Sequence, residues 1–225
     1  MAAAIPPVKA LARPNAILFD WDNTLVDSWP TIHDALNTTL AAFGRTPWTL
    51  AETRRRVRKS MRDSFPALFG NDWQNAGEVF YRRYGEIHAR NLKPLPGAAA
   101  MLDAIAATGV YLGVVSNKKG DFLRVEARHL GWDRYFGALV GALDAERDKP
   151  APEPVRLALK GSGVTPGPAV WIAGDADIDL ECAHNAGCTA VLIRAAAPGH
   201  GEFDAHPPAG HFGGCDALSK YVKNL

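Results

Sequence analysis

The chain has 225 residues, of which 47% are hydrophobic, so it can bury a sizeable core and is not expected to be disordered. Its net charge of +1 provides no global field for nucleic acid or an anionic membrane, and no apolar stretch is long enough to span a bilayer. The three cysteines have no zinc-like spacing, and the N-terminus lacks a signal-peptide pattern. We therefore expect a cytoplasmic protein without nucleic-acid or membrane partners.

After an Ala- and Pro-rich arm at 1–13, the apolar run 16–19 predicts a buried strand that ends at Asp20. Asp22 follows two residues later, and residues two apart in an extended chain point to the same side. Two like charges this close are costly unless a cation neutralises them, and a hard divalent ion, Mg²⁺ above all, is the natural partner. The alternative is that the two aspartates only cap a helix or lie in a solvated turn.

A helical pattern begins at Pro30, where apolar residues recur at intervals of three and four until Gly44. Further helices are expected at about 50–60, 62–69 and 72–90. The run Pro94-Leu95-Pro96-Gly97 then breaks the pattern. Residues 28–93 are therefore predicted to be an all-helical insertion.

From residue 98 onward, helices and strands alternate. Strands are expected at 110–115, 138–141, 169–173 and 189–193, and helices at 98–107, 121–130, 153–160, 177–186 and 216–222. The Gly-, Pro- and His-rich stretch 196–214 is predicted to be a loop. This alternation predicts an α/β fold with a Rossmann-like, doubly wound parallel sheet built from residues 14–27 and 94–225.

Ligands of such sheets bind outside the carboxyl ends of the strands, which is where Asp20, Ser116 and Asp175 are expected. The Ser116 hydroxyl and the backbone N–H of Asn117 suit phosphate oxygens, although both residues are also common helix caps.

Two further segments carry charge near strand ends. The stiff segment Asp148-Lys149-Pro150 could aim Lys149 inward, although most lysines are simply solvated. In Gly174-Asp175-Ala176-Asp177-Ile178-Asp179, three acids crowd the start of a helix, which favours cation binding. Asp175 and Asp179 are four apart, so they face the same way if the turn is helical.

Taken in order, these segments resemble the haloacid dehalogenase-like superfamily of phosphohydrolases. The family carries an aspartate pair after the first strand, Ser or Thr after the second, a lysine before the fourth and Gly-Asp-x-x-x-Asp after it. The matching residues are Asp20 and Asp22 with Thr24 behind, Ser116 and Asn117, Lys149, and Gly174, Asp175 and Asp179. The match spans about residues 15–194, and its Ser-Asn-Lys and Asp-Lys-Pro-x-Pro runs look like the phosphoglycolate phosphatase-like branch. Two positions depart from the family pattern. Position 23 is Asn where many members have Gly, and position 176 is Ala where a small hydroxyl residue is common.

The resemblance implies an Mg²⁺-dependent phosphomonoester hydrolase that acts on a small phosphorylated metabolite, with phosphoglycolate as one candidate. Asp20 would be the nucleophile that forms an aspartyl-phosphate, and Asp22 the general acid and base. The implied metal site comprises Asp20, Asp175, the backbone carbonyl of Asp22 and Asp179 close by. The implied phosphate site comprises Thr24, Ser116, Asn117 and Lys149.

The insertion at 28–93 would be a mobile cap that closes over the site. Arg58, Lys59 and Arg62 are candidate contacts for an anionic substrate, and a solvated helix face is the alternative. Three other functions stay open: a phosphomutase of the beta-phosphoglucomutase type, a phosphate-binding module with a dead site, and a receiver-like signalling module. Monomer and homodimer are both compatible with the sequence.

Overall fold

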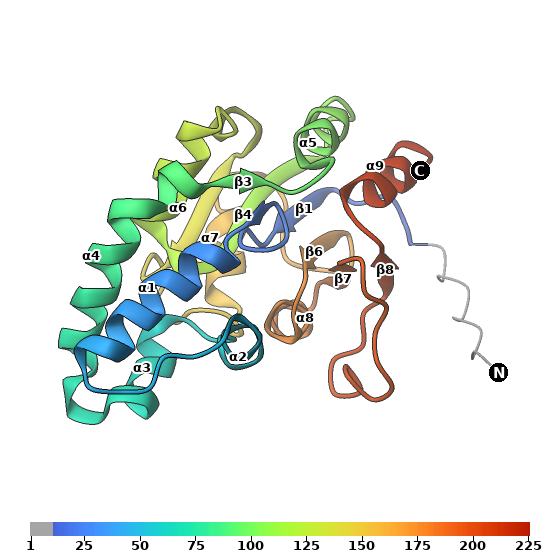
Figure 1. Ribbon diagram of the computed structural model, residues 1–225. Coiled ribbons are helices and arrows are strands. Elements are labelled where there is room, and N and C mark those ends of the chain that lie inside the picture. The colour runs from blue at the N-terminus through green and yellow to red at the C-terminus, as the bar shows by residue number, and fades with distance from the viewer. Residues whose placement is uncertain (1–10) are drawn as a thin grey trace.

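A six-stranded parallel sheet forms the centre of the computed structural model, which describes residues 11–225 (Figure 1). The arm expected at 1–13 lies mostly outside the described residues. The strand order is β5-β4-β1-β6-β7-β8. The strands are β1 (Ala16–Phe19), β4 (Tyr111–Lys119), β5 (Ala138–Ala142), β6 (Val170–Gly174), β7 (Thr189–Ile193) and β8 (Gly210–Phe212). The predicted doubly wound α/β fold is confirmed.

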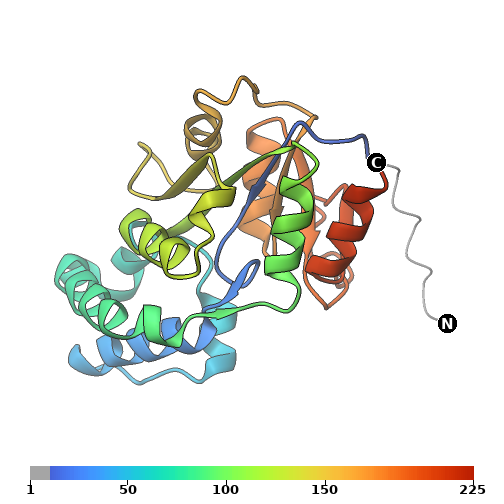
Figure 2. The same ribbon diagram turned by 90° about the horizontal axis from the view of Figure 1, so that it is seen from above.

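Helices cover both faces of this sheet because every residue of β1 is apolar and buried. Ile17 and Phe19 pack on one face with α5 (Ala98–Ala106), α6 (Gly120–His129) and α9 (Cys215–Lys223). Ala16 and Leu18 pack on the other face with α7 (Glu153–Leu159) and α8 (Asp177–Asn185). Figure 2 shows α5 and α9 side by side along the first face.

The insertion is helical, as predicted, and lies to one side of the sheet (Figure 1). Its α-helices are α1 (Trp29–Ala42), α2 (Leu50–Arg56), α3 (Met61–Phe69) and α4 (Trp73–Asn91). They bury a small apolar core of their own around Leu36, Leu40, Phe65 and Phe69. Short 3₁₀ helices occur at Gly70–Asp72 and Asp133–Tyr135. None of the helices in the described part of the chain combines the length and apolar character needed to cross a bilayer.

The two chain segments that lead into and out of the insertion pair with each other. The two-residue strands β2 (Val26–Asp27) and β3 (Lys93–Pro94) are antiparallel, with Val26 opposite Pro94. Strands this short leave no periodic signal in a sequence, so this pair was not predicted. Because the pair lies beside both predicted boundaries, we propose that the core comprises 14–27 and 94–225 and the cap 28–93.

Two predictions about strands were wrong in extent. The strand expected at 110–115 continues as β4 to Lys119, with a register shift between Val115 and Lys119 that frees the intervening residues from regular pairing. The stretch 196–214 is not all loop, because β8 (Gly210–Phe212) pairs with β7 at the edge of the sheet. A three-residue strand that begins with glycine carries no alternation to detect.

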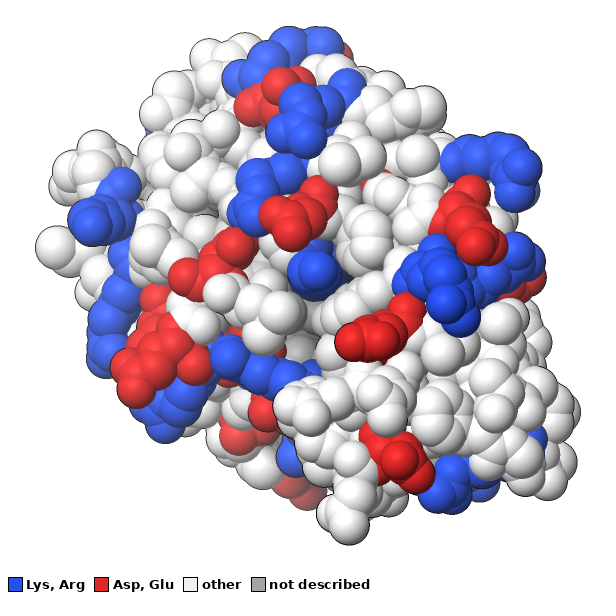
Figure 3. Space-filling view, turned by 90° about the vertical axis from the view of Figure 1, so that its left-hand side faces the viewer, with Lys and Arg blue, Asp and Glu red and all other residues white. Residues whose placement is uncertain are grey.

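On the side of the molecule shown in Figure 3, Lys and Arg side chains are interspersed with Asp and Glu. This face carries no continuous patch of one sign, in keeping with the net charge of +1.

Gly141 lies where β5 passes against the start of α6, and any side chain there would meet backbone. A Cβ on Gly141 would stand 2.5 Å from the Lys118 carbonyl oxygen and the Gly120 Cα. We predict that Gly141→Ala lowers the free energy of unfolding by about 1–3 kcal/mol, because one backbone segment must move. Chemical denaturation measures this loss. The control is Gly167→Ala, whose Cβ meets nothing within 4 Å and should change stability by less than about 0.5 kcal/mol. Equal stabilities of the two variants would contradict this account of the packing.

Candidate active site

The loop after β1 turns sharply and sends two aspartates and a tryptophan in different directions. Trp21 is fully buried in the core, while Asp20 and Asp22 face a pocket between sheet and cap. Asn23 adopts the left-handed conformation, with φ of 64°, and its N–H donates to the Val26 carbonyl at 2.6 Å. Asn tolerates this geometry, so the departure from glycine at position 23 keeps the turn.

The acids after β6 meet the acid after β1 because the two strands are direct neighbours, with Phe19 opposite Ala173. Carboxylate oxygens of Asp20, Asp175 and Asp179 all lie within 4.8 Å of one another. Asp179 folds back over Gly174, where a Cβ would come within 2.2 Å of its carboxylate. Glycine at 174 is therefore required for Asp179 to reach the group.

Lys149 enters the acidic group from the loop before α7. Its ammonium donates to Asp20 Oδ1 at 2.8 Å and to Asp179 Oδ1 at 2.6 Å, and the residue is only 1% exposed. The alternative of a solvated lysine is thereby removed. Burial alone would lower the pKa of Lys149, but the carboxylates of Asp179 and Asp20 raise it well above its usual value, so Lys149 stays charged.

One lysine does not balance three carboxylates. Burial raises the pKa of Asp175 well above its usual value, and the charges of Asp179 and Asp20 add to the effect. Burial also raises the pKa of Asp179 to about 6, with Asp20 adding to the rise and Lys149 opposing it. These shifts show that Lys149 offsets only part of the repulsion among the three carboxylates. Their converging oxygen atoms are a donor set that fits a hard divalent cation.

The remaining predicted core residues line the same pocket. Ser116 is buried there, and its Oγ accepts a hydrogen bond from the Lys118 N–H at 3.3 Å. The Asn117 side chain donates to the Lys149 carbonyl at 3.1 Å, so it ties the β4 end to the lysine loop. The Asp22 side chain is not part of the acidic group, since its Oδ1 pairs with the Lys118 ammonium at 2.7 Å.

Two predicted contacts lie elsewhere. Thr24 is fully buried and does not line the pocket; its hydroxyl donates to Asp175 Oδ1 at 3.5 Å, so it supports Asp175 and does not face a phosphate. Arg62 holds Asp148 through two hydrogen bonds of 2.6 Å and does not line the pocket either. Its guanidinium is engaged by a buried carboxylate of the core, which the position of Arg62 in the sequence could not reveal.

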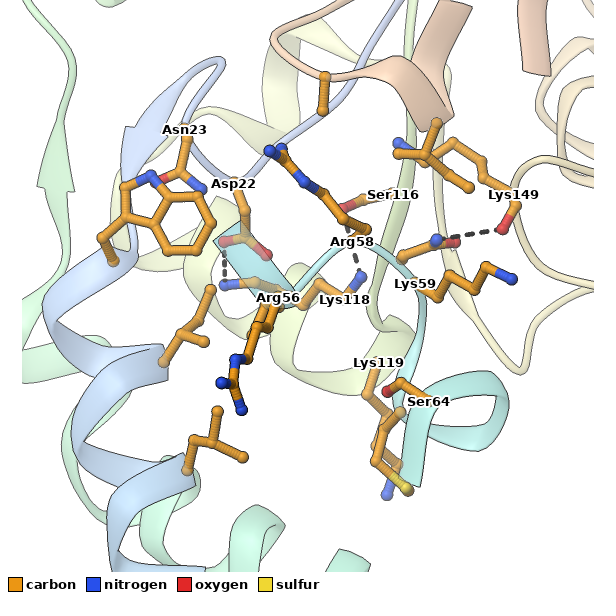
Figure 4. A pocket seen from close by; sticks show the side chains of 18 of the residues that line it. Asp22, Asn23, Arg56, Arg58, Lys59, Ser64, Ser116, Lys118, Lys119 and Lys149 are labelled. Atoms are coloured by element: carbon orange, nitrogen blue, oxygen red, sulfur yellow. Dashed lines mark hydrogen bonds and ion pairs between the residues drawn. The ribbon is translucent and has the colours of Figure 1, made fainter. Parts of the chain in front are cut away.

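The cap supplies the outer wall of the pocket. Figure 4 shows Arg58 and Lys59, on the segment that joins α2 to α3, and Arg56, the last residue of α2, in the same pocket as Ser116 and Lys118. Apolar side chains of the cap complete this wall, including Trp29, Leu36, Trp48, Phe65 and Phe80.

Lys118 is a site residue that the sequence analysis missed. It is buried in the pocket wall and contacts Asp22 directly (Figure 4). A signal was present, because Lys118 lies two residues after Ser116 in an extended segment and must point to the same side. The sequence also held a signal for Glu126, the buried ion-pair partner of Lys118. Glu126 is a charged residue between Leu123 and Ala127 on the apolar face of α6.

Comparison with known proteins places this geometry in a family. The model of the haloacid dehalogenase-like hydrolases matches residues 17–193. A phosphoglycolate phosphatase of Xylella fastidiosa is 33% identical over 185 residues, which cover 80% of each protein. An N-acetylmuramic acid 6-phosphate phosphatase of Pseudomonas aeruginosa is 32% identical, covering 81% of this chain and 82% of that protein.

A solved structure supports the fold. The haloacid dehalogenase-like family hydrolase of Streptococcus pneumoniae superposes with a TM-score of 0.81 at 19% identity, covering 93% of this chain and 98% of that one. The relatives confirm the predicted resemblance, including its phosphoglycolate phosphatase-like branch, and the predicted enzyme class of phosphatase. The chain belongs to the haloacid dehalogenase-like hydrolase family.

Proposed function

We propose that this protein is an Mg²⁺-dependent phosphomonoester hydrolase that works through an aspartyl-phosphate on Asp20. The observation that carries the proposal is the convergence of Asp20, Asp175 and Asp179 around the Lys149 ammonium, with Asp22 two residues beyond the nucleophile. Asp20, Asp175 and Asp179 would hold the metal, together with the Asp22 backbone carbonyl. When bound, Mg²⁺ offsets the carboxylate charge and polarises the phosphoryl group.

The first half of the reaction forms the covalent enzyme. Lys149 holds Oδ1 of Asp20 at 2.8 Å, which leaves Oδ2 to attack phosphorus. The bond from phosphorus to the ester oxygen breaks, and Asp22 gives that oxygen its proton, so that an alcohol leaves. Lys149, the Ser116 hydroxyl and the Asn117 N–H hold the phosphoryl oxygens as charge develops.

The second half restores the enzyme. Asp22, now a carboxylate, takes a proton from a water that attacks phosphorus, and inorganic phosphate and free Asp20 result. The cap wall would keep bulk water away while the ester is cleaved.

The substrate class follows from the pocket wall. Arg58 and Lys59 add positive charge beyond what the phosphoryl group needs, which favours a small phosphomonoester with a second anionic group. Phosphoglycolate, the substrate named for several relatives, has this character, and N-acetylmuramic acid 6-phosphate is a second candidate. A cytoplasmic location and a monomeric or homodimeric state stay predictions.

A phosphate-release screen tests the function. The panel comprises phosphoglycolate, N-acetylmuramic acid 6-phosphate, sugar phosphates and nucleoside monophosphates with Mg²⁺. We expect at least one to release stoichiometric inorganic phosphate, and Asp20→Asn to lower kcat by about 10³-fold or more, because no carboxylate is left to attack. Circular dichroism checks that the variant is folded. Substrate consumed without phosphate release would indicate a phosphomutase, and full activity of Asp20→Asn would refute the nucleophile.

Mg²⁺ binding has a readout that is independent of activity. At about a hundredfold over Kd, Mg²⁺ should stabilise the fold by about 2.7 kcal/mol, which raises Tm by roughly 5–10 °C. The pKa of Asp179 is raised to about 6, and that of Asp175 is raised as well. The metal-free fold therefore loses stability as pH rises from the ordinary range of an aspartate to about 6, where the buried Asp179 must ionise. Protons compete with metal below that pH, so the Tm gain should be large at pH 7.5 and small at pH 5.

The acidic segment 174–179 contains a matched control for the Mg²⁺-dependent gain in Tm. Asp175→Asn should abolish most of the Mg²⁺-dependent Tm gain, because a carboxylate ligand is lost. Asp177→Asn, an exposed acid outside the cluster, should keep the gain. A similar gain in Tm for the wild-type protein and both variants at pH 7.5 would show that the metal binds elsewhere.

The role of the cap cations Arg58 and Lys59 can be tested against Arg55, a nearby residue at the end of α2. We expect the double variant Arg58→Ala, Lys59→Ala to raise KM for phosphoglycolate about tenfold or more, since charge-assisted contacts are lost, and to leave kcat nearly unchanged. Arg55→Ala removes an exposed charge of α2 that does not line the pocket, and should change neither. Steady-state kinetics measures both parameters. An unchanged KM in the double variant would refute the assignment of Arg58 and Lys59 as substrate contacts.

A further inference from the structure

The proposed general acid is held by one oxygen only. Among residues 11–225, the Asp22 carboxylate contacts two donors, the Lys118 ammonium at 2.7 Å and the Ser28 hydroxyl, and both approach Oδ1. Oδ2 is therefore left for a proton and for the substrate. Because two donors fix Oδ1, the carboxyl group keeps its orientation, and a proton on Oδ2 stays in a defined place. The place of this proton matters because proton transfer needs hydrogen-bond geometry to the leaving oxygen.

Lys118 is itself fixed in place. Its ammonium has three N–H donors, and it also contacts Glu126 Oε1 at 2.9 Å, Glu126 Oε2 at 2.7 Å and the Tyr84 hydroxyl. Its side chain is 3% exposed, so water does not compete for these donors. The ammonium cannot move from Asp22 without breaking contacts to Glu126.

Glu126 is fixed in turn by three further donors. The Trp21 indole N–H donates to Oε2 at 2.7 Å, the Tyr84 hydroxyl donates to Oε1 at 3.1 Å, and His88 Nδ1 lies 2.8 Å from Oε1. Burial would raise the pKa of Glu126, but Lys118 and the hydrogen bonds lower it to about 2, so Glu126 is a carboxylate.

Three separate parts of the fold meet at this pair. Trp21 comes from the loop between the two catalytic acids, Lys118 and Glu126 come from β4 and α6, and Tyr84 and His88 come from cap helix α4. The cap therefore contributes two side chains to the surroundings of Asp22.

A buried ion pair is a poor source of stability, because removing two charges from water costs nearly as much as their attraction returns. An apolar pair of similar volume would hold α6 against β4 at least as well. The Lys118 ammonium of this pair also contacts Asp22, which lines the pocket, and this contact indicates a role beyond packing.

We propose that Lys118 is a positioning residue that holds Asp22 for proton transfer to the leaving group. In this arrangement Glu126 anchors Lys118, and Tyr84 and His88 of the cap contact the Lys118–Glu126 pair. This inference rests on the proposed function. It assigns Lys118 no bond-making role: Asp22 donates the proton, and Lys118 fixes where that proton lies.

The experiment separates the leaving-group proton from the rest of catalysis. Benzyl phosphate and 4-nitrophenyl phosphate are similar in size, but the benzyl alkoxide needs a proton to leave and 4-nitrophenolate does not. The parameter kcat/KM covers all steps up to departure of the leaving group, so the later hydrolysis of the aspartyl-phosphate does not affect it.

The test variant is the double substitution Lys118→Met, Glu126→Gln, which removes both charges of the buried pair together, so that neither Lys118 nor Glu126 remains as an unpaired buried ion. We expect kcat/KM for benzyl phosphate to fall about 30- to 100-fold and that for 4-nitrophenyl phosphate to fall less than about threefold. Glu126→Gln alone should show the same selective loss in smaller degree, because Lys118 loses its anchor. Arg124→Met, also on α6 but paired with exposed Asp121 and Asp144, is the control and should change neither rate.

Each outcome has one meaning. Equal losses on both esters in the two variants would show a merely structural role and overturn the inference. Unchanged rates on both esters would overturn it as well. A wild-type protein that hydrolyses neither ester and nothing in the phosphate-release screen would instead refute the proposed function.

Discussion

Repulsion among buried carboxylates at one edge of the sheet is the constraint on which the rest of the site depends. β1 and β6 are neighbours, so Asp20 and Asp175 leave the sheet side by side, and Asp179 joins them from the first turn of α8. Lys149 offsets only part of this charge. Such a group is tolerable in a fold only when a further positive charge is available, and that need is also what makes it useful for handling phosphate.

The pocket has two sides with different electrostatic tasks. On one side, Asp20, the proposed nucleophile, and Asp179 are paired with Lys149. On the other side, Asp22, the proposed general acid, is paired with Lys118. Trp21 separates the two acids and anchors the loop between them in the core, so each carboxylate has its own lysine and its own surroundings.

The sequence predicted the parts of this site that depend on strand ends. Asp20 and Asp175 follow short apolar runs, and a parallel sheet brings the carboxyl ends of its strands to one edge. It could not predict contacts that depend on how helices pack. Glu126 meets Lys118 only because α6 lies against β4 and α4, and Arg62 turns to Asp148 only because α3 lies over the loop before α7. The edge strand β8 and the linker pair β2–β3 were missed because they are two or three residues long.

Mn²⁺ offers the most direct test of the central claim, that acids distant in the chain share one cation. Mn²⁺ takes the same oxygen ligands as Mg²⁺ and gives an anomalous X-ray signal. In crystals grown with Mn²⁺, the account predicts one strong anomalous peak about 2–2.3 Å from carboxylate oxygens of both Asp20 and Asp175. A fully occupied Mn²⁺ site away from both residues, or no peak between them at saturating Mn²⁺, would contradict it.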